Sequence, residues 1–242
     1  MKYINILRPW QWVKNLLILI PSLLNKPFIG ESFLDSLNIF FLFSLLVSGN
    51  YILNDIIDIE SDKLHPKKKF RPIASGEINL NVGKIYSGVI IIASIFFVNL
   101  IQSDLLIYFL GYLIIANIYS HYLKYIFILS SLSISIFFLI RLLIGGVVSN
   151  VDISIYLSTY IFISSFFIAI LKKSSIINTK GIKDNNYLDT LKKENKLFDT
   201  EKLSLITLFL SNLTLIIWSI INLGNLSLLK ASSGLLFLTF YF

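Results

Sequence analysis

Residues 54–62, NDIIDIESD, place four acids at the end of a membrane-length apolar run. At about 100° per residue of an α-helix, Asp55, Asp58 and Asp62 lie within about 60° of one another, whereas Glu60 points away. Carboxylates on one helix face repel one another near hydrocarbon unless they share a hard cation. Mg²⁺ suits this position because it accepts one or two carboxylates and completes its shell with water and substrate phosphates. The three aspartates are therefore predicted to be catalytic residues and ligands of Mg²⁺.

A basic loop follows this acidic stretch within a few residues. The segment reads DKLHPKKKFRPIASG, in which Pro66 and Pro72 break the helix and leave a run of basic residues in a loop. Acids that hold Mg²⁺ and basic side chains that bind phosphate oxygens are the two halves of a diphosphate site, so the loop that carries Lys67, Lys68, Lys69 and Arg71 is predicted to bind phosphate. Asn54 can donate and accept hydrogen bonds at the same rim. The alternative is a solvated helix end followed by lysines that only mark the cytoplasmic side.

The composition indicates a polytopic membrane protein. Of the 242 residues, 55% are hydrophobic and 14% are charged, and the mean hydropathy is +0.77. A helix that crosses a bilayer needs about 20 predominantly apolar residues. The expected fold class is an all-α membrane helix bundle that forms one domain over residues 1–242. Its eight predicted runs lie near residues 10–25, 33–53, 82–101, 104–120, 125–148, 153–171, 203–221 and 226–242.

The basic residues are distributed unevenly over the loops between these runs. Most of the 21 Lys and Arg residues fall in the N-terminal segment, in residues 62–82, near residue 124 and in residues 172–202, which all lie on one side of the predicted bundle. Cytoplasmic loops are enriched in Lys and Arg. The N-terminus and the loops of about 54–82 and 172–202 are therefore predicted to be cytoplasmic, in a protein of the inner (cell) membrane.

The sequence argues against several kinds of site, partner and processing. The chain has no cysteine, so it carries no disulfide and no thiolate metal site. The net charge of +7 is accounted for by topology and by phosphate-bearing ligands, so no nucleic-acid partner is expected. The first apolar run passes through Pro21 to Lys26 without a small-residue cleavage site, which indicates a retained helix. The apolar end LLFLTFYF indicates either a very short C-terminus or a truncated chain.

Further candidate residues lie inside or beside the predicted helices. Arg141 lies within FFLIRLLIGG, and an intramembrane arginine is costly enough to suggest contact with a substrate phosphate. The alternative is a structural partner for a carboxylate or for helix-end carbonyl groups. Tyr119 and Lys124 close the fourth run, where they either bind a second phosphate or form an interfacial belt. Gly145 and Gly146 are predicted to allow close helix approach.

Taken together, these motifs resemble those of a known family. NDIIDIESD followed by RPIASG is similar to the N-D-x-x-D-x-x-x-D signature of the UbiA superfamily of intramembrane prenyltransferases. RPWQWVKN, DKLHPKKKFRPIASG, YSHYLK and IRLLIGG together resemble one branch, the decaprenyl-phosphate phosphoribosyltransferases. The resemblance extends over residues from about 8 to 171.

The resemblance implies a transferase with about nine membrane helices, of which eight are apparent here, around a cavity open to the cytoplasm and to lipid. Mg²⁺ would hold the diphosphate of phosphoribosyl diphosphate while a polyprenyl phosphate attacks C1 of the ribose. The metal-binding residues would be Asp55, Asp58 and Asp62. The complete set of expected substrate-binding residues is Lys14, Asn54, Lys67, Arg71, Tyr119, Lys124, Arg141 and Lys172.

The loop after the sixth run departs from this family pattern. The branch has K-R-x-A-E-L there, whereas this sequence reads KKSSIINTKG, so Lys172 and Lys173 match the basic pair but Ile176 replaces the acid. Asp184 and Asp189 could compensate if the loop folds inward. Two other functions stay open. One is a prenyltransferase that moves a prenyl group from prenyl diphosphate to an aromatic or other small acceptor, and the other is a catalytically impaired family member that binds lipid.

Overall fold

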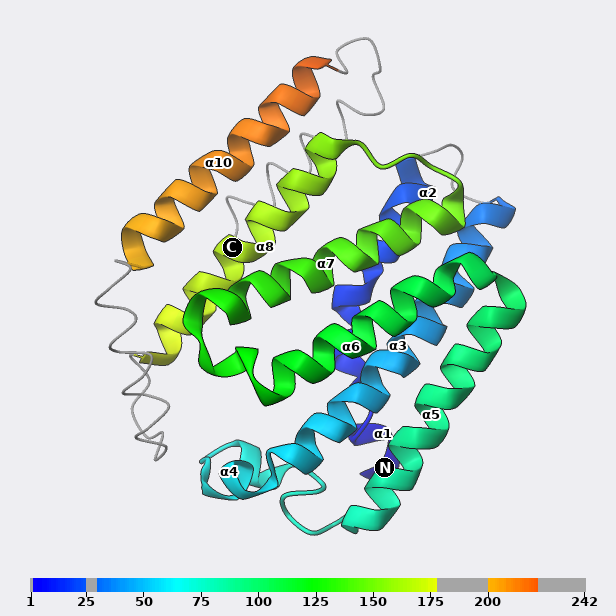
Figure 1. Ribbon diagram of the computed structural model, residues 1–242, viewed down its shortest axis with the longest axis vertical. Coiled ribbons are helices and arrows are strands. Elements are labelled where there is room, and N and C mark those ends of the chain that lie inside the picture. The colour runs from blue at the N-terminus through cyan, green and yellow to red at the C-terminus, as the bar shows by residue number, and fades with distance from the viewer. Residues whose placement is uncertain (1, 25–29, 178–199, 222–242) are drawn as a thin grey trace.

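The computed structural model describes residues 2–24, 30–177 and 200–221, and every regular element within them is a helix. The elements form an elongated bundle in which long helices run side by side (Figure 1). In chain order they are α1 (Lys2–Asn5), η1 (Pro9–Leu19), α2 (Ile20–Leu24), α3 (Glu31–Ile57), α4 (Ile59–Leu64), η2 (Lys68–Phe70), α5 (Leu80–Ile101), η3 (Ser103–Leu105), α6 (Leu106–His121), η4 (Leu123–Tyr125), α7 (Phe127–Ser149), α8 (Ile155–Ile177) and α10 (Thr200–Ile221).

Six helices of the described residues are long and apolar enough to cross a membrane. They are α3, α5, α6 with η3, α7, α8 and α10, and they correspond to six of the eight predicted runs. The prediction of an all-α, multi-pass membrane bundle is thus confirmed. The eighth predicted run, residues 226–242, and most of the predicted loop at 172–202 lie outside the described residues.

The first predicted run, residues 10–25, is not a continuous α-helix, and that prediction was wrong. The segment is a 3₁₀ helix, η1, followed by the short α2. Its polar side chains are used inside the bundle: Trp12 Nε1 donates to Ser48 Oγ at 2.9 Å and Asn15 Nδ2 donates to Ser44 Oγ at 2.9 Å. These bonds tie η1 to α3, so the segment forms a wall of the bundle that buries Asn15 and Ile18 and leaves Trp10 and Val13 exposed.

Gly145 of α7 permits a close approach between α7 and this wall. A Cβ atom at Gly145 would lie 2.3 Å from the backbone oxygen of Ile18 in η1. Only glycine leaves room for two backbones to meet at that separation. The prediction that Gly145 allows close helix approach is confirmed.

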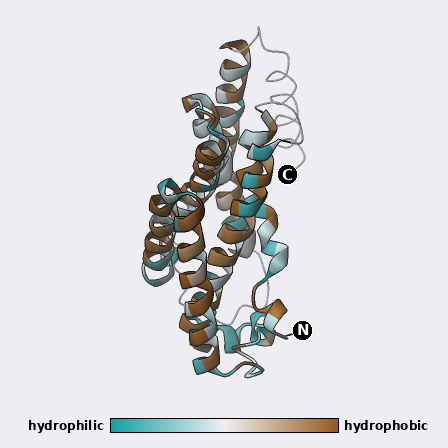
Figure 2. Cartoon of the chain, turned by 90° about the vertical axis from the view of Figure 1, so that its right-hand side faces the viewer, coloured by the Kyte–Doolittle hydropathy of each residue, from teal (hydrophilic) through white to brown (hydrophobic). Residues whose placement is uncertain are grey.

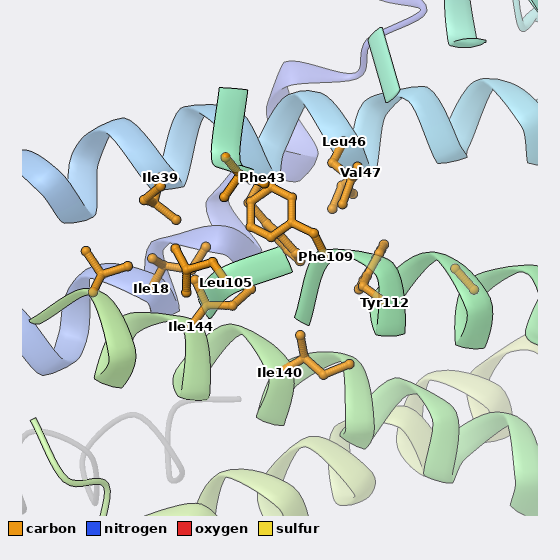
Figure 3. Close-up of a cluster of buried hydrophobic side chains, with 13 residues drawn as sticks. Ile18, Ile39, Phe43, Leu46, Val47, Leu105, Phe109, Tyr112, Ile140 and Ile144 are labelled. Atoms are coloured by element: carbon orange, nitrogen blue, oxygen red, sulfur yellow. The ribbon is translucent and has the colours of Figure 1, made fainter. Parts of the chain in front are cut away.

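The main hydrophobic core lies between α3, α6 and α7 (Figure 3). Phe43 of α3 is fully buried and packs edge to face on Phe109 and Tyr112 of α6, with ring centroids 5.2 and 5.1 Å apart. Ile144 of α7 and Ile18 of η1 belong to the same cluster. Such aromatic pairs contribute about 0.5–1.5 kcal/mol beyond their area burial. This packing fixes α3, which carries the acidic stretch, against its neighbours.

The outer surface of the bundle is apolar. Ile85, Val89, Ile92 and Phe96 of α5 are all more than half exposed. Figure 2 shows helices that are largely hydrophobic along their length, with hydrophilic residues prominent at the end where the N-terminus lies. Faces of this kind are stable against lipid chains, because the helix satisfies its own backbone hydrogen bonds.

The connections rich in basic residues meet at one end of the bundle. Ser120, at the end of α6, donates a hydrogen bond to Asn54 of α3, and Lys124 in η4 pairs with Asp58. Phe127 at the start of α7 packs in one cluster with Ile170 near the end of α8. We call this region the polar end: residues 2–8, 54–79, 120–127 and 170–173.

Candidate functional site

The acidic stretch bends where its second aspartate lies. Helix α3 ends at Ile57, Asp58 has φ −90° and ψ 8°, and α4 begins at Ile59. The prediction of an uninterrupted helix through the acids was therefore wrong, although Asp62 N still donates to Asp58 O at 2.8 Å. Because of the bend, the three aspartates do not share one helix face.

Asp55 is the most heavily paired of the acids. Its carboxylate is 2% exposed, and both oxygens accept hydrogen bonds from Arg8 Nη2, the one to Oδ2 at 2.6 Å. Arg71 Nη1 donates to Oδ1 at 3.0 Å. A buried carboxylate requires such partners, because desolvation of an unpaired charge costs several kcal/mol.

Asp62 shares Arg71 with Asp55 but retains an unsatisfied oxygen. Arg71 Nη1 donates to Asp62 Oδ2 at 2.5 Å. The other oxygen, Oδ1, is buried and accepts no hydrogen bond, and Lys68 Nζ lies 3.7 Å from it. Asp62 is 1% exposed, so this oxygen is a buried acceptor without a hydrogen-bond donor.

Asp58 and Glu60 lie away from this buried pair. Asp58 pairs with Lys124 of η4, and its side chain is 25% exposed. Glu60 is 82% exposed and pairs with Lys63 at 2.9 Å, as expected for the acid that the helical spacing placed on another face. Asp58 therefore borders the site at the α6–α7 connection.

An inner cavity of about 300 Å³ lies on the bundle side of the acidic stretch. Its lining includes Asn54, three basic residues (Lys14, Arg141 and Lys172) and several aromatic and aliphatic side chains. None of the described residues that line it is acidic. Such a cavity has the chemistry of a site for an anion that carries an apolar tail.

Arg141 is held in place beneath this inner cavity. Its side chain is buried, with Nε donating to Asn15 Oδ1 at 2.7 Å and Nη1 donating to the Phe137 carbonyl oxygen. Its guanidinium carbon lies 5.4 Å from the centroid of the Tyr112 ring and 5.7 Å from that of Phe138. Arg141 thus bonds a carbonyl group in the middle of α7, not a carboxylate or a helix-end carbonyl group, and it also borders the cavity. Its contact with a substrate phosphate stays a prediction.

An outer cavity of about 510 Å³ lies on the loop side of the acidic stretch. Arg8, Lys67 and Arg71 line it, together with Phe70 and Glu77. Asp55 thus lies between the two cavities, because its partners Arg8 and Arg71 line the outer one and its neighbour Asn54 lines the inner one.

His65 shapes the loop that contributes to the outer cavity. Its Nδ1 accepts hydrogen bonds from the backbone N–H groups of Lys67 and Lys68, at 3.1 and 3.2 Å. Burial and the nearby Lys68 charge lower the pKa of His65 below its usual value. The neutral imidazole is the form that can accept both bonds.

The structure brings together most of the predicted residues. Asp55, Asp62 and Arg71 meet directly, while Asp58 meets Lys124. The other predicted residues line the cavities: Lys67 the outer one, and Lys14, Asn54, Tyr119, Arg141 and Lys172 the inner one. Their assignment as catalytic, metal-binding or substrate-binding residues stays a prediction.

Sequence reasoning missed Arg8 as a site residue. It was counted only as a charge near the N-terminus, although it begins the segment RPWQWVKN. Its backbone adopts a left-handed conformation, with φ 52° and ψ 59°, just before Pro9. Nothing in a local pattern indicates that this side chain reaches Asp55, which lies 47 positions away.

The two residues of the basic pair, Lys172 and Lys173, make different contacts. Lys172 lines the inner cavity, whereas Lys173 is buried and bonds Ser130 Oγ and the Phe127 carbonyl oxygen at the start of α7. Ile176 lies within α8, and Asp184 and Asp189 lie outside the described residues.

The residues of the acidic stretch fit a bound Mg²⁺. Carboxylate oxygens are the ligands that this ion prefers, and the unsatisfied Oδ1 of Asp62 offers one that is already buried. Within residues 2–24, 30–177 and 200–221, no three acidic or histidine side chains form a metal-binding group. The protein would therefore supply about two carboxylates, with diphosphate oxygens and water completing the shell.

Comparison with known proteins identifies relatives of this chain. The sequence model of the UbiA prenyltransferase family matches residues 28–242 of this chain. Decaprenyl-phosphate phosphoribosyltransferase of Corynebacterium glutamicum is 42% identical over 86 residues, which cover 34% of this chain and 25% of that protein. The enzyme of the same name from Mycobacterium tuberculosis H37Rv is 39% identical over 80 residues, or 31% of this chain and 26% of that protein. The chain thus spans about a quarter of the length of these relatives.

Solved structures show the same fold. A UbiA homologue from Archaeoglobus fulgidus bound to DMAPP and Mg²⁺ superposes with a TM-score of 0.76 at 17% identity, covering 100% of this chain and 85% of that one. At this identity the likeness concerns the helical architecture alone.

Proposed function

The chain belongs to the UbiA prenyltransferase family and is a multi-pass membrane transferase, and we propose that it moves phosphoribosyl from phosphoribosyl diphosphate to polyprenyl phosphate. The observation that carries this proposal is the presence of two cationic cavities, one on each side of Asp55. A reaction between two phosphate-bearing substrates needs two such sites. The relatives named decaprenyl-phosphate phosphoribosyltransferase support the same assignment.

In this proposal the donor occupies the outer cavity. Asp55 and Asp62, with Asp58 at the border, would hold Mg²⁺ against the donor diphosphate, and Lys67 and Arg71 would donate to its free oxygens. When bound, Mg²⁺ neutralises the charge that develops on the leaving diphosphate. Charge-assisted hydrogen bonds from arginine fix the orientation of the donor because the guanidinium binds two oxygens at once.

The acceptor occupies the inner cavity. Lys14, Arg141 and Lys172 would bind its phosphate, and aromatic side chains such as Phe138 would contact its first apolar carbons. The three cations reduce the repulsion between acceptor phosphate and donor diphosphate. A phosphate oxygen of the acceptor then attacks C1 of the ribose, the C1–O bond breaks, and its electron pair leaves with the diphosphate. No nucleophile from the protein is required.

A second candidate function uses the same acidic stretch with the roles changed. Here a prenyl diphosphate is the donor and an aromatic or other small molecule is the acceptor. The apolar and aromatic lining of the inner cavity favours it, as does the fold shared with a homologue that binds DMAPP.

The donor distinguishes the two functions. Purified protein in detergent with Mg²⁺ is given either phosphoribosyl diphosphate with polyprenyl phosphate, or prenyl diphosphate with 4-hydroxybenzoate, and released diphosphate is measured. We expect release from the first pair only. Release from the second pair alone would favour the prenyltransferase, and release from neither would favour a lipid-binding family member without this activity.

We further infer that the polar end faces the cytoplasm, since it gathers basic residues. The chain has no cysteine, so single cysteines report their side cleanly. The substitution Ser61→Cys places a cysteine at the polar end, and Asp104→Cys places one in η3, between α5 and α6. A membrane-impermeant maleimide applied to intact spheroplasts should label only the Asp104 variant. The opposite labelling would reverse the orientation.

A further inference from the structure

Arg71 occupies the position that a shared cation would take. Its Nη1 atom lies 3.0 Å from Asp55 Oδ1 and 2.5 Å from Asp62 Oδ2, so one nitrogen joins both buried carboxylates. A metal ion shared by these two carboxylates would compete with this nitrogen for them. Metal and guanidinium therefore compete for a single place, which we call the cation position.

The side chain of Arg71 has room to leave the cation position. It lines the outer cavity of about 510 Å³ and is 26% exposed. The loop that carries it is anchored, because Ile73 and Ile78 are buried in one cluster with Ile6 and Ile52. Rotation of the side chain, without movement of the loop, suffices to carry the guanidinium into the cavity.

Arg8 differs from Arg71 in this respect. It binds Asp55 alone, through both carboxylate oxygens, and its guanidinium carbon lies 5.4 Å from the centroid of the Tyr51 ring. These contacts keep Asp55 paired when Arg71 departs. Asp62 has no second strong partner, since Lys68 Nζ lies 3.7 Å from the unsatisfied Oδ1.

We propose that Arg71 is an exchangeable placeholder for the metal. Its guanidinium holds Asp55 and Asp62 together in the metal-free protein and moves onto the substrate diphosphate when Mg²⁺ and diphosphate bind. This inference rests on the proposed diphosphate site and assigns a regulatory role to one of its residues. Metal alone must displace a paired arginine, whereas metal with diphosphate offers that arginine a new partner. The two ligands therefore bind cooperatively, and Arg71 is the source of the coupling.

Binding of Mn²⁺ to the purified protein, measured by electron paramagnetic resonance with and without inorganic diphosphate, tests this exchange. In the wild type we expect diphosphate to tighten Mn²⁺ binding by about tenfold or more, relative to a protein-free diphosphate control. In Arg71→Gln we expect Mn²⁺ alone to bind about tenfold more tightly than in the wild type, because the competitor is gone, with only about threefold further gain from diphosphate.

Lys69→Gln is the matched control. Lys69 is an exposed cation in the same loop, lying 5.0 Å from the Phe70 ring centroid, so its removal changes the loop charge equally. It should bind Mn²⁺ as the wild type does. If Arg71→Gln does not fold, Arg71→Lys retains a charge but not the planar fork, and it should bind Mn²⁺ alone about threefold more tightly.

The outcomes separate the placeholder from the site itself. If the Arg71 variants bind Mn²⁺ alone no more tightly than Lys69→Gln, while diphosphate still tightens binding, the placeholder role is wrong and the diphosphate site stands. If the wild type binds no Mn²⁺ even with diphosphate, the proposed metal site itself is wrong.

Discussion

Arg141 Nε donates a hydrogen bond of 2.7 Å to Asn15 Oδ1, although the two residues are 126 positions apart. The bond joins α7 to η1 and fixes the guanidinium beneath the inner cavity. It helps to hold the 3₁₀ segment against the bundle, because Asn15 also donates to Ser44 of α3.

Asn15→Leu should destabilise the protein by about 1–3 kcal/mol, since it leaves a buried charged donor without its acceptor. Thermal unfolding in detergent measures this effect. Asn117→Leu, an exposed position on α6, is the control and should unfold as the wild type does. Equal unfolding of all three proteins would show that the bond does not stabilise the fold.

Gly145→Ala should destabilise the bundle by about 1–3 kcal/mol, because the added Cβ meets the Ile18 backbone oxygen and forces η1 away from α7. Gly111→Ala in α6 is the matched control, since nothing lies within 4 Å of a Cβ there. Alanine favours a helix interior, so the control should be neutral or stabilising. A Gly145 variant as stable as the Gly111 variant would contradict the close approach.

In the described part of the chain, the sequence predicted those features of the fold that a single pattern, such as an apolar run, is sufficient to indicate. Six apolar runs and the distribution of Lys and Arg give the spanning helices and the end at which their connections meet. The first run misled because its apolar content does not reveal that Trp12 and Asn15 bond α3.

The site was predictable only as a set of residue types. The acidic stretch and the basic loop identify Asp55, Asp62 and Arg71, but helical spacing assumes a regular helix, and Asp58 interrupts it. The pairing of Arg8 with Asp55 depends on tertiary structure, so no local pattern could supply it.

The loop around His65 should be sensitive to acid. The folded-state pKa of His65 lies below its unfolded value, so its stabilising contribution is complete above the unfolded pKa and is lost as the pH falls through the folded one. His65→Asn keeps an acceptor for the backbone N–H groups of Lys67 and Lys68 but does not titrate. Lowering the pH from 7.5 to 5.5 should therefore reduce the unfolding temperature of the wild type more than that of the variant. Parallel pH profiles would contradict this assignment.

Asp58→Asn should reduce Mg²⁺-dependent turnover by about 100-fold or more, because a site that stabilises the leaving diphosphate supplies several kcal/mol. Glu60→Gln, at an acid that is 82% exposed, should retain the wild-type rate. The two variants are compared by their rates of diphosphate release. A rate within about threefold of wild type for Asp58→Asn would remove Asp58 from the catalytic residues.

Formation of the lipid product tests the central claim most directly. Phosphoribosyl diphosphate labelled in its ribose is incubated with purified protein, polyprenyl phosphate and Mg²⁺, and label is followed into the organic phase. We predict labelled lipid only when acceptor and Mg²⁺ are both present, and about 100-fold less of it with Asp58→Asn. Failure of the wild type to move label into lipid, under conditions in which the folded protein binds polyprenyl phosphate, would contradict the proposed phosphoribosyl transfer.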